Sequence, residues 1–446
     1  MTARKAVSVR GWQLRVGLAC ALGFLYLLGG PDNRGNRKIS GANSPNPSSP
    51  ATALFTPAGD FWAGAGVPSA CAFPKETGTE LNQETNLLAL EADIAPLRSI
   101  VDPFPSFNGI AVDPANNRVI LSDSNRKSLL VYDRMSKSNS AEPSRPLAQV
   151  TGPVTQIGFV AGVTIDPVAR EMYAVSNDIE DVMVAFSYEA QGNAPPRVLA
   201  VPHGAWGLSL SRARNEIAVS VEHENAVYVY RRAAEGYERP LRSIHGPSTQ
   251  MADPHGISLD ATHQEIAVAN HGNVNSRRVV NEQSVGPDAK LGGRFLLPSV
   301  TFYPATAQGD TKPLRVLQGD RTQLDWPMGI DIDAVHDELA VANNGDHSVL
   351  IFQRSEGGNV APVRVIRGPQ TKIRAPMAVS VDSQNDEIWV ANFEDHSAVV
   401  FDRTASGNAA PKRIIRSAPE GAPTGGFGNP MAVGYDSKRD EILVPN

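Results

Sequence analysis

Four histidines and two acids are the side chains of this 446-residue sequence whose types could do metal chemistry. They fall within one central segment: His203, Glu222, His223, Asp253, His255 and His271. Neutral imidazoles and carboxylates are common ligands of divalent metals. Their spacing matches no defined metal motif, and such residues are also ordinary in polar surface loops. The residue types therefore raise a metal site as a hypothesis and leave a solvated polar rim as the alternative.

Other catalytic chemistry finds no support in the sequence. A Gly-x-Ser-x-Gly elbow, a His-Glu-x-x-His motif and a phosphate-binding loop are all absent. The two cysteines, Cys20 and Cys71, provide neither a disulfide framework nor a zinc ribbon. Nucleophilic catalysis by serine or cysteine is therefore not indicated. The sequence does not decide whether the chain is an enzyme, and the absence of these motifs favours a non-enzymatic role.

The elements that must position these residues are copies of one repeated pattern. "GIAVDPANNRVILSDSNRKSLLVY" and "GIDIDAVHDELAVANNGDHSVLIF" are two copies, and each contains several strand-sized apolar pieces separated by turn residues. The first strand of each copy begins at Gly109, Gly162, Gly207, Gly256, Gly329, Ala378 and Ala432. A period near 50 residues with short strands is typical of a β-propeller.

Counting these copies predicts seven blades. The last copy ends at Asn446 with only two strands, whereas two outer-type strands begin at Thr85 with no inner pair before them. The "PLRSI" at Pro96 recurs at Pro240. We therefore expect an all-β, seven-bladed propeller of four-stranded blades over residues 85–446, closed by the N-terminal third and fourth strands pairing with the C-terminal first and second strands. Such closure would remove free sheet edges.

Two repeated residues have expected structural roles. An aspartate ends most first strands, where its carboxylate can accept N–H bonds in the following turn. An arginine recurs on each outermost strand, where a charge limits edge-to-edge pairing.

The topology predicts which loops share a face. Connections between blades and turns between the second and third strands should surround one mouth of the central channel. The residues expected to bind a ligand there are His203, Trp206, His255, Trp326, Asn343 and Asn392. The fourth copy also carries an insertion over residues 271–299, which is either a functional loop or disordered.

The N-terminus has the composition of a targeting segment. Basic residues precede an apolar run from Val16 to Gly30, followed by a Ser-, Asn- and Pro-rich stretch. We expect residues 1–30 to be a signal peptide or signal anchor and residues 31–84 to be a flexible tether and lead-in. The run would reach about 22 Å as a helix, short of a ~30 Å hydrocarbon core. The propeller should then be secreted, periplasmic or anchored outside the cytoplasm, with the membrane contacted only through this segment.

The formal net charge of −6 argues against a nucleic-acid partner, since nucleic-acid-binding proteins normally carry a basic patch.

The repeats resemble NHL repeats and the related bacterial propeller repeats named for a Tyr-Val-Thr-Asn signature, on the strength of "PMGIDIDAVHDELAVANNGDHSVLIF" and its copies. The resemblance covers about Thr85 to Asn446. Seven blades would favour the Tyr-Val-Thr-Asn and lactonase-type group over NHL propellers, which usually have six. These families include lactonases, a lyase, RNA-binding domains and exported proteins without known activity, so the resemblance implies the fold more than the function.

Two functions follow as expectations. The first is a binding module that takes a protein, peptide or glycan of the cell envelope at its channel mouth. The second, implied by the lactonase resemblance, is a metal-dependent hydrolase or lyase with one divalent ion, calcium, zinc or manganese. For this alternative Asp253 is the expected base, and the expected metal ligands are Glu222, His255, Asn270 and His271.

Overall fold

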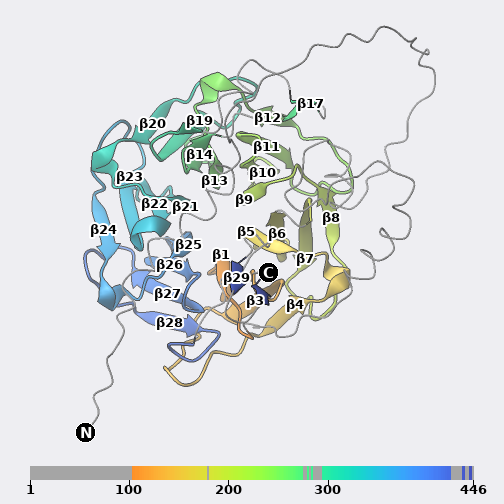
Figure 1. Ribbon diagram of the computed structural model, residues 1–446, viewed down its shortest axis with the longest axis vertical. Coiled ribbons are helices and arrows are strands. Elements are labelled where there is room, and N and C mark those ends of the chain that lie inside the picture. Colours follow the sequence, from red (N-terminus) through yellow and green to blue (C-terminus); the bar gives the residue numbers. More distant parts are fainter. Residues whose placement is uncertain are drawn as a thin grey trace, which may run out of the picture. The chain divides into compact units, whose positions relative to one another are not determined.

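Six four-stranded antiparallel sheets surround a central axis (Figure 1). The computed structural model describes residues 103–177, 180–274, 279–280, 283–284, 294–422, 434–436 and 441–443. Within each sheet the strand nearest the axis comes first in the chain and the outermost strand comes last. The prediction of an all-β propeller with four-stranded blades is therefore confirmed, and we number the blades 1 to 6 in chain order.

Equivalent strands of the six blades have similar lengths. The innermost strands are β1 (Phe107–Asp113), β5 (Phe159–Asp166), β9 (Ala205–Ser211), β13 (Pro254–Asp260), β21 (Pro327–Asp333) and β25 (Pro376–Asp382). The second strands are β2 (Arg118–Asp123), β6 (Glu171–Asn177), β10 (Glu216–Val221), β14 (Glu265–Asn270), β22 (Glu338–Asn343) and β26 (Glu387–Asn392). The third strands are β3 (Ser128–Asp133), β7 (Val182–Ser187), β11 (Ala226–Arg231), β19 (Ser299–Pro304), β23 (Ser348–Gln353) and β27 (Ser397–Asp402). The outermost strands are β4 (Ala148–Thr151), β8 (Arg197–Ala200), β12 (Arg242–Ile244), β20 (Arg315–Gln318), β24 (Arg364–Arg367) and β28 (Arg413–Arg416).

The prediction of seven blades was wrong, because blade 6 packs directly against blade 1. Phe107 and Tyr132 of blade 1 share a buried core with Trp389 of blade 6. The loop after β3 completes the seam, because the Ser138 and Ser144 backbone N–H groups donate to carbonyls of β28 at 2.9 and 2.8 Å. This direct contact leaves no place for a seventh blade between them.

The C-terminal repeat forms a hairpin outside the six blades. Strands β29 (Gly434–Asp436) and β30 (Glu441–Leu443) pair with each other as a separate two-stranded sheet. The sequence therefore identified a strand pair correctly but assigned it to the ring wrongly. The N-terminal strands expected to complete it begin at Thr85, outside the described residues, as do the signal and tether segments. In the part of the chain that the structure describes, no helix is long and apolar enough to cross a membrane.

Burial on both faces explains why the second strands are so apolar. Strand β22 reads "ELAVAN", and every residue after its first is buried, because a blade lies on each side of its sheet. Glycine permits the close approach of the innermost strands. A Cβ at Gly207 would collide with the carbonyl of His255, and one at Gly256 would collide with the carbonyl of Met328.

The two repeated charges stabilise each blade internally. The aspartate at the end of the first strand accepts turn N–H bonds, as predicted; Asp333 Oδ1, for example, accepts from Val335 at 3.0 Å. The outer strand of blade 1 carries no arginine, contrary to the expectation that each would. The arginines that begin the outer strands of blades 2 to 6 do more than limit edge pairing, because each forms an ion pair with the glutamate that begins the second strand of its own blade. These pairs are Arg197–Glu171, Arg242–Glu216, Arg315–Glu265, Arg364–Glu338 and Arg413–Glu387.

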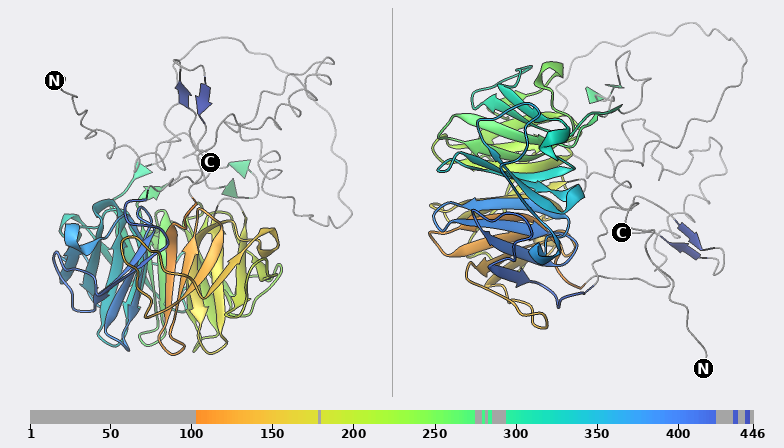
Figure 2. Two further views of the ribbon diagram at one scale, coloured as in Figure 1. Left: turned by 90° about the horizontal axis from the view of Figure 1, so that it is seen from below. Right: turned by 90° about the vertical axis from the view of Figure 1, so that its left-hand side faces the viewer.

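One face of the ring carries both kinds of loop predicted to form the channel mouth. In blade 4 the His271 N–H, after the second strand, donates to the carbonyl of Asp253, before the first strand, at 3.0 Å. The Asn344 N–H makes the same bond to Trp326 in blade 5 at 3.1 Å. Figure 2 shows the strands running between this face and the opposite one. We call it the mouth face.

Candidate functional site

Six side chains from blades 3, 4 and 5 gather on the mouth face. We call them the mouth cluster: Trp206, Glu222, Asp253, His255, His271 and Trp326. Trp206 and His255 lie on innermost strands, one residue before the glycines that allow close strand approach. The others come from the loops that precede an innermost strand or follow a second strand. The repeated pattern thus positions residues that are far apart in the sequence.

His255 is the centre of the cluster. Its Nε2 lies 3.2 Å from Glu222 Oε2. Its Nδ1 lies 3.0 Å from the Asp253 carbonyl oxygen and 3.6 Å from the Asp253 carboxylate. The side chain is 5% exposed. A carboxylate therefore lies beside each nitrogen of a buried imidazole.

Four rings contact one another in a continuous row across the cluster, three of them stacked and Trp206 tilted against the end, and we call this row the stack. The Trp206 ring lies 4.3 Å from that of His255, at a tilt of 56°. The His255 and His271 rings are stacked at 3.5 Å, and His271 is stacked on Trp326 with centroids 5.1 Å apart. Both tryptophans are partly exposed. The stack therefore joins blades 3, 4 and 5 and presents an indole at each end.

Burial and charge divide the protonation states of the cluster. Burial opposes ionisation of Glu222, but hydrogen bonding to His255 and the charges of His255 and His223 outweigh it, so the pKa of Glu222 is lowered. Burial also opposes the charge on His255, yet Asp253 and Glu222 leave its pKa raised. Burial and the charge of His255 hold the pKa of His271 well below its usual range. The two stacked imidazoles therefore differ in electrostatic environment: protonation is favoured at His255 and disfavoured at His271.

The surroundings of Asp253 disfavour the ionised form of its carboxyl group and hold its backbone in a left-handed conformation. Burial raises the pKa of its carboxyl. Its backbone is left-handed, with φ of 59°, and its N–H donates to Asn225 Oδ1 at 2.7 Å. Asn273 Nδ2 donates to its Oδ2 at 2.9 Å. Trp326, at the equivalent position of blade 5, is also left-handed with φ of 49°. Glycine takes this position in blade 3, as Gly204 with φ of 79°.

His203 and His223 lie next to each other at the edge of this group. Their rings are 5.0 Å apart, and His223 Nε2 lies 3.1 Å from Glu222 Oε1. His203 Nδ1 instead lies 2.9 Å from Asp181. The predicted ligand-binding residue His203 is therefore joined to the mouth cluster through His223.

The three predicted asparagines have their amides occupied by the fold. Asn270 Oδ1 accepts from Ala252 N–H at 3.1 Å, and its Nδ2 donates to the Val268 carbonyl at 3.0 Å. Asn343 and Asn392 make the corresponding bonds to the loops before β21 and β25. All three are fully buried. These side chains fasten the loops that carry the site.

Three of the predicted residues bring potential metal-binding atoms close together. One donor atom each from Asp253, His255 and His271 lies within 4.8 Å of the other two. Glu222 is not part of this group and contacts His255 through the other ring nitrogen. The arrangement could hold one ion with two nitrogens and one carboxylate oxygen, or it could act without a metal as an acid–base pair.

Asn225 and Asn273, which hold Asp253, were not among the residues predicted from the sequence. Asn225 ends a tight turn with φ of 50°, a conformation that asparagine tolerates well, so turn position was its one available signal. Asn273 opens the insertion at β15 (Asn273–Val274), which pairs with β18 (Arg294–Phe295). Nothing in the local pattern of Asn273 indicates a contact with a residue 20 positions away.

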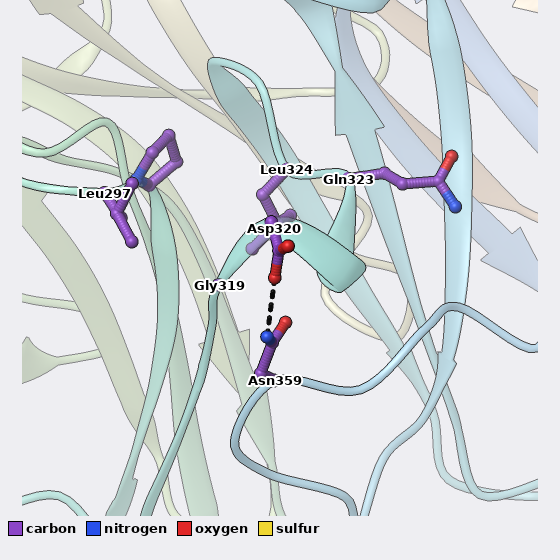
Figure 3. A pocket seen from close by; sticks show the side chains of 7 residues that line it. Leu297, Gly319, Asp320, Gln323, Leu324 and Asn359 are labelled. Carbon is purple, nitrogen blue, oxygen red and sulfur yellow. Dashed lines mark hydrogen bonds between the residues drawn. The ribbon is translucent and has the colours of Figure 1, made fainter.

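Two cavities are present among the described residues, and Trp206 of the mouth cluster is among the residues that line the first. The central channel is a space of about 170 Å³ between the innermost strands, and Asp331 is among the residues that line it. A second pocket lies beside the loop after β20, lined in part by Leu297 and Leu324 (Figure 3). In Figure 3 Asn359 donates to Asp320, at 2.6 Å, and this bond fastens the loop. Neither cavity contains the gathered imidazoles and acids of the mouth.

Comparison with known proteins identifies no family for this chain. No family model and no curated protein matches the chain. Among solved structures it is similar to hydrazine synthase of Kuenenia stuttgartiensis, with a TM-score of 0.47 and 12% identity over 70% of this chain and 100% of that one. It is also similar to a chain of a nidogen/laminin complex, with a TM-score of 0.44 and 14% identity over 70% of this chain and 92% of that one. At these identities the likeness concerns the fold alone.

Proposed function

We propose that this chain is a binding module whose propeller takes a ligand at the mouth cluster. The observation that carries the proposal is the stack of Trp206, His255, His271 and Trp326. Tryptophan is enriched at binding hot spots because it supplies a large rigid surface. Both indoles are partly exposed, whereas most aromatic rings of the blades are buried.

The position before the innermost strand is left-handed in blades 3 to 6, and in blades 4 and 5 the fold holds the large side chains of Asp253 and Trp326 there. Asp253 and Trp326 adopt left-handed backbone conformations, which cost about 1–2 kcal/mol for a residue with a side chain. Such strain persists where the surrounding structure enforces it, and it concentrates at functional sites. Asparagines, buried or half-buried, hold both loops by accepting from their backbone N–H groups.

The partner we propose is a protein, peptide or glycan of the cell envelope. The N-terminal sequence favours export, with the propeller secreted, periplasmic or anchored outside the cytoplasm. The acidic chain makes nucleic acid a poor candidate. A ring of six blades is also the number usual for NHL propellers, and we therefore favour the NHL part of the proposed resemblance over the Tyr-Val-Thr-Asn part.

The test is a screen of glycan and peptide libraries with the purified chain, followed by affinity measurements on two variants. Trp206→Ala and Trp326→Ala should each weaken the selected ligand about tenfold or more, because each removes an end of the stack. His336→Ala, on the opposite face, is the control and should leave the affinity unchanged. Unchanged affinity in both tryptophan variants would place the ligand elsewhere.

The second candidate is a metal-dependent, lactonase-like hydrolase or lyase. The observation that favours it is the approach of Asp253, His255 and His271 within 4.8 Å. A metal there would polarise a carbonyl or activate water. Activity on a lactone and ester panel, lost in Glu222→Gln and His255→Ala, would support this candidate. Activity that survives in both variants would contradict it.

A further inference from the structure

We propose that Asp253, His255 and His271 form a binding site for a zinc-class transition metal. Donor atoms of the three residues lie within 4.8 Å of one another, and both imidazoles are buried. Two imidazoles and one carboxylate leave a coordination position open for water or a ligand. The inference concerns the mouth cluster but does not require that the chain be a hydrolase.

The nitrogen atoms that face the site can be identified from the contacts. His255 Nδ1 lies 3.6 Å from Asp253 Oδ1, and His271 Nδ1 lies 3.7 Å from Asp253 Oδ2. Each opposite nitrogen is occupied: His255 Nε2 lies near Glu222, and His271 Nε2 lies 2.9 Å from the Met328 thioether sulfur. Both imidazoles thus present the same ring nitrogen, Nδ1, to one carboxylate, and His255 Nδ1 would exchange its 3.0 Å contact with the Asp253 carbonyl oxygen for the ion.

The neighbours of the three ligands form a supporting shell. Asn273 Nδ2 donates to the Asp253 carboxylate, and Asn225 Oδ1 accepts from its backbone N–H. Glu222 orients the His255 ring from the side away from the site. Metal-binding histidines and carboxylates are usually oriented in this way by outer partners, which set the ligand geometry before the ion arrives.

The donor set favours zinc over calcium. Calcium prefers six to eight oxygen ligands, whereas zinc accepts imidazole nitrogen and carboxylate oxygen in fourfold coordination. The oxygen ligand that the sequence suggested, Asn270, is fully buried and makes three hydrogen bonds within the fold. The sequence-predicted set of four therefore becomes a set of three, in which Asp253 is a ligand and Glu222 a positioning residue.

The experiment loads the purified full chain with zinc chloride after removal of metals by a chelator. Elemental mass spectrometry and isothermal titration calorimetry should give about one equivalent of zinc per chain, and calcium chloride should give no binding. His271→Ala and the near-isosteric Asp253→Asn should each weaken zinc binding about tenfold or more. His263→Ala, which removes a histidine paired with an acid elsewhere in blade 4, should not change it.

Glu222→Gln distinguishes the proposed set from the one suggested by the sequence. The glutamine can still accept a hydrogen bond from His255, so one equivalent of zinc should remain. The inference is overturned if no zinc binds, if both His271→Ala and Asp253→Asn retain it, if calcium binds at the same residues, or if Glu222→Gln abolishes binding. Circular dichroism of each variant separates loss of the site from loss of the fold. Zinc binding and the tryptophan-dependent ligand affinity are measured separately, so either proposal can fail alone.

Discussion

In blade 4, His255 lies at the start of strand β13 and His263 lies in the turn that follows its other end, and each lies near a carboxylate. His263 Nδ1 lies 2.6 Å from Asp260, three residues away in the same turn. His255 instead lies between Glu222 of blade 3 and Asp253 of the preceding loop, and its ring stacks on two other side chains. His263 thus has the shorter contact with a carboxylate, but that contact lies within a single turn, whereas the contacts of His255 join two blades.

Equivalent positions in the other blades explain the difference. In blade 5 His336 contacts Asp333 at 2.7 Å, as His263 does Asp260, and in blades 1 and 6 an asparagine makes the same contact. The position equivalent to His255 holds tryptophan in blade 3 and methionine in blades 5 and 6. A contact that recurs from blade to blade stabilises the repeat, whereas a contact between residues that vary among blades marks a candidate site.

Breaking a recurring contact should have the largest effect on stability. Glu338 accepts from Arg364 at 2.6 and 2.8 Å and from Arg403 at 3.2 Å, and its side chain is 14% exposed. Glu338→Ala would leave both guanidinium groups without this carboxylate and should lower the free energy of unfolding by about 3 kcal/mol. Urea denaturation measures the change. A loss below about 1 kcal/mol would show that these ion pairs contribute little.

The recurring contacts are also what the sequence made predictable. Four-stranded blades, the turn aspartates and the mouth face all follow from one repeated pattern, because each copy must make the same local bonds. The number of blades does not follow, because it depends on the angle at which neighbouring sheets pack. Seven strand pairs were counted correctly, yet the cores of Trp389 and Phe107 meet and close six blades.

The candidate site was predictable only in part, for the same reason. His255, His271 and Asp253 stand out because they depart from the repeat and the topology assigns them to one face. Their roles depend on ring orientation, which the sequence does not specify. Asn270 illustrates this limit, because its side chain could bind a metal but is oriented toward Ala252 and Val268.

Asp331, inside the central channel, departs from the repeated pattern. Asp331 Oδ2 accepts from the Val381 N–H at 2.8 Å, as the Ser209 hydroxyl does from Leu259. Burial raises the pKa of Asp331 to about 6, opposed by its backbone hydrogen bonds. Because the folded pKa exceeds the unfolded value, the ionised carboxylate destabilises the fold above about pH 6, and this cost disappears as the pH falls toward 4.

Asp331→Asn keeps an acceptor for Val381 and removes the charge. The free energy of unfolding should rise by about 2 kcal/mol at pH 7.5, and the difference from the original chain should shrink toward zero near pH 4. Denaturation at the two pH values measures both. An equal gain at both pH values would mean that the charge is not the cause.

Glycine substitutions at the left-handed position before the innermost strand should have a smaller effect on stability. Ala375 is left-handed with φ of 42°, at the position that Gly204 takes in blade 3 and Trp326 in blade 5. Ala375→Gly should stabilise the chain by up to about 1 kcal/mol, because glycine adopts this conformation without a Cβ clash. Trp326→Gly gains the same relief but should also lose ligand affinity. If both variants bind ligand equally well, neither the indole nor the backbone strain at Trp326 has a role in binding.

The smallest effect should come from exchanging one recurring residue for another. Asn116 and Asn385 donate to their aspartates at 2.7 Å, the distance that separates His336 Nδ1 from Asp333. His336→Asn should therefore change the free energy of unfolding by less than about 0.5 kcal/mol. His255→Asn should instead weaken ligand binding, because asparagine cannot stack between Trp206 and His271 while reaching Glu222. Thermal denaturation and ligand titration of the two variants, side by side, compare a recurring contact of blade 5 with the unique contacts of His255 in blade 4. Equal losses of ligand affinity in both would refute the distinction between recurring and unique contacts.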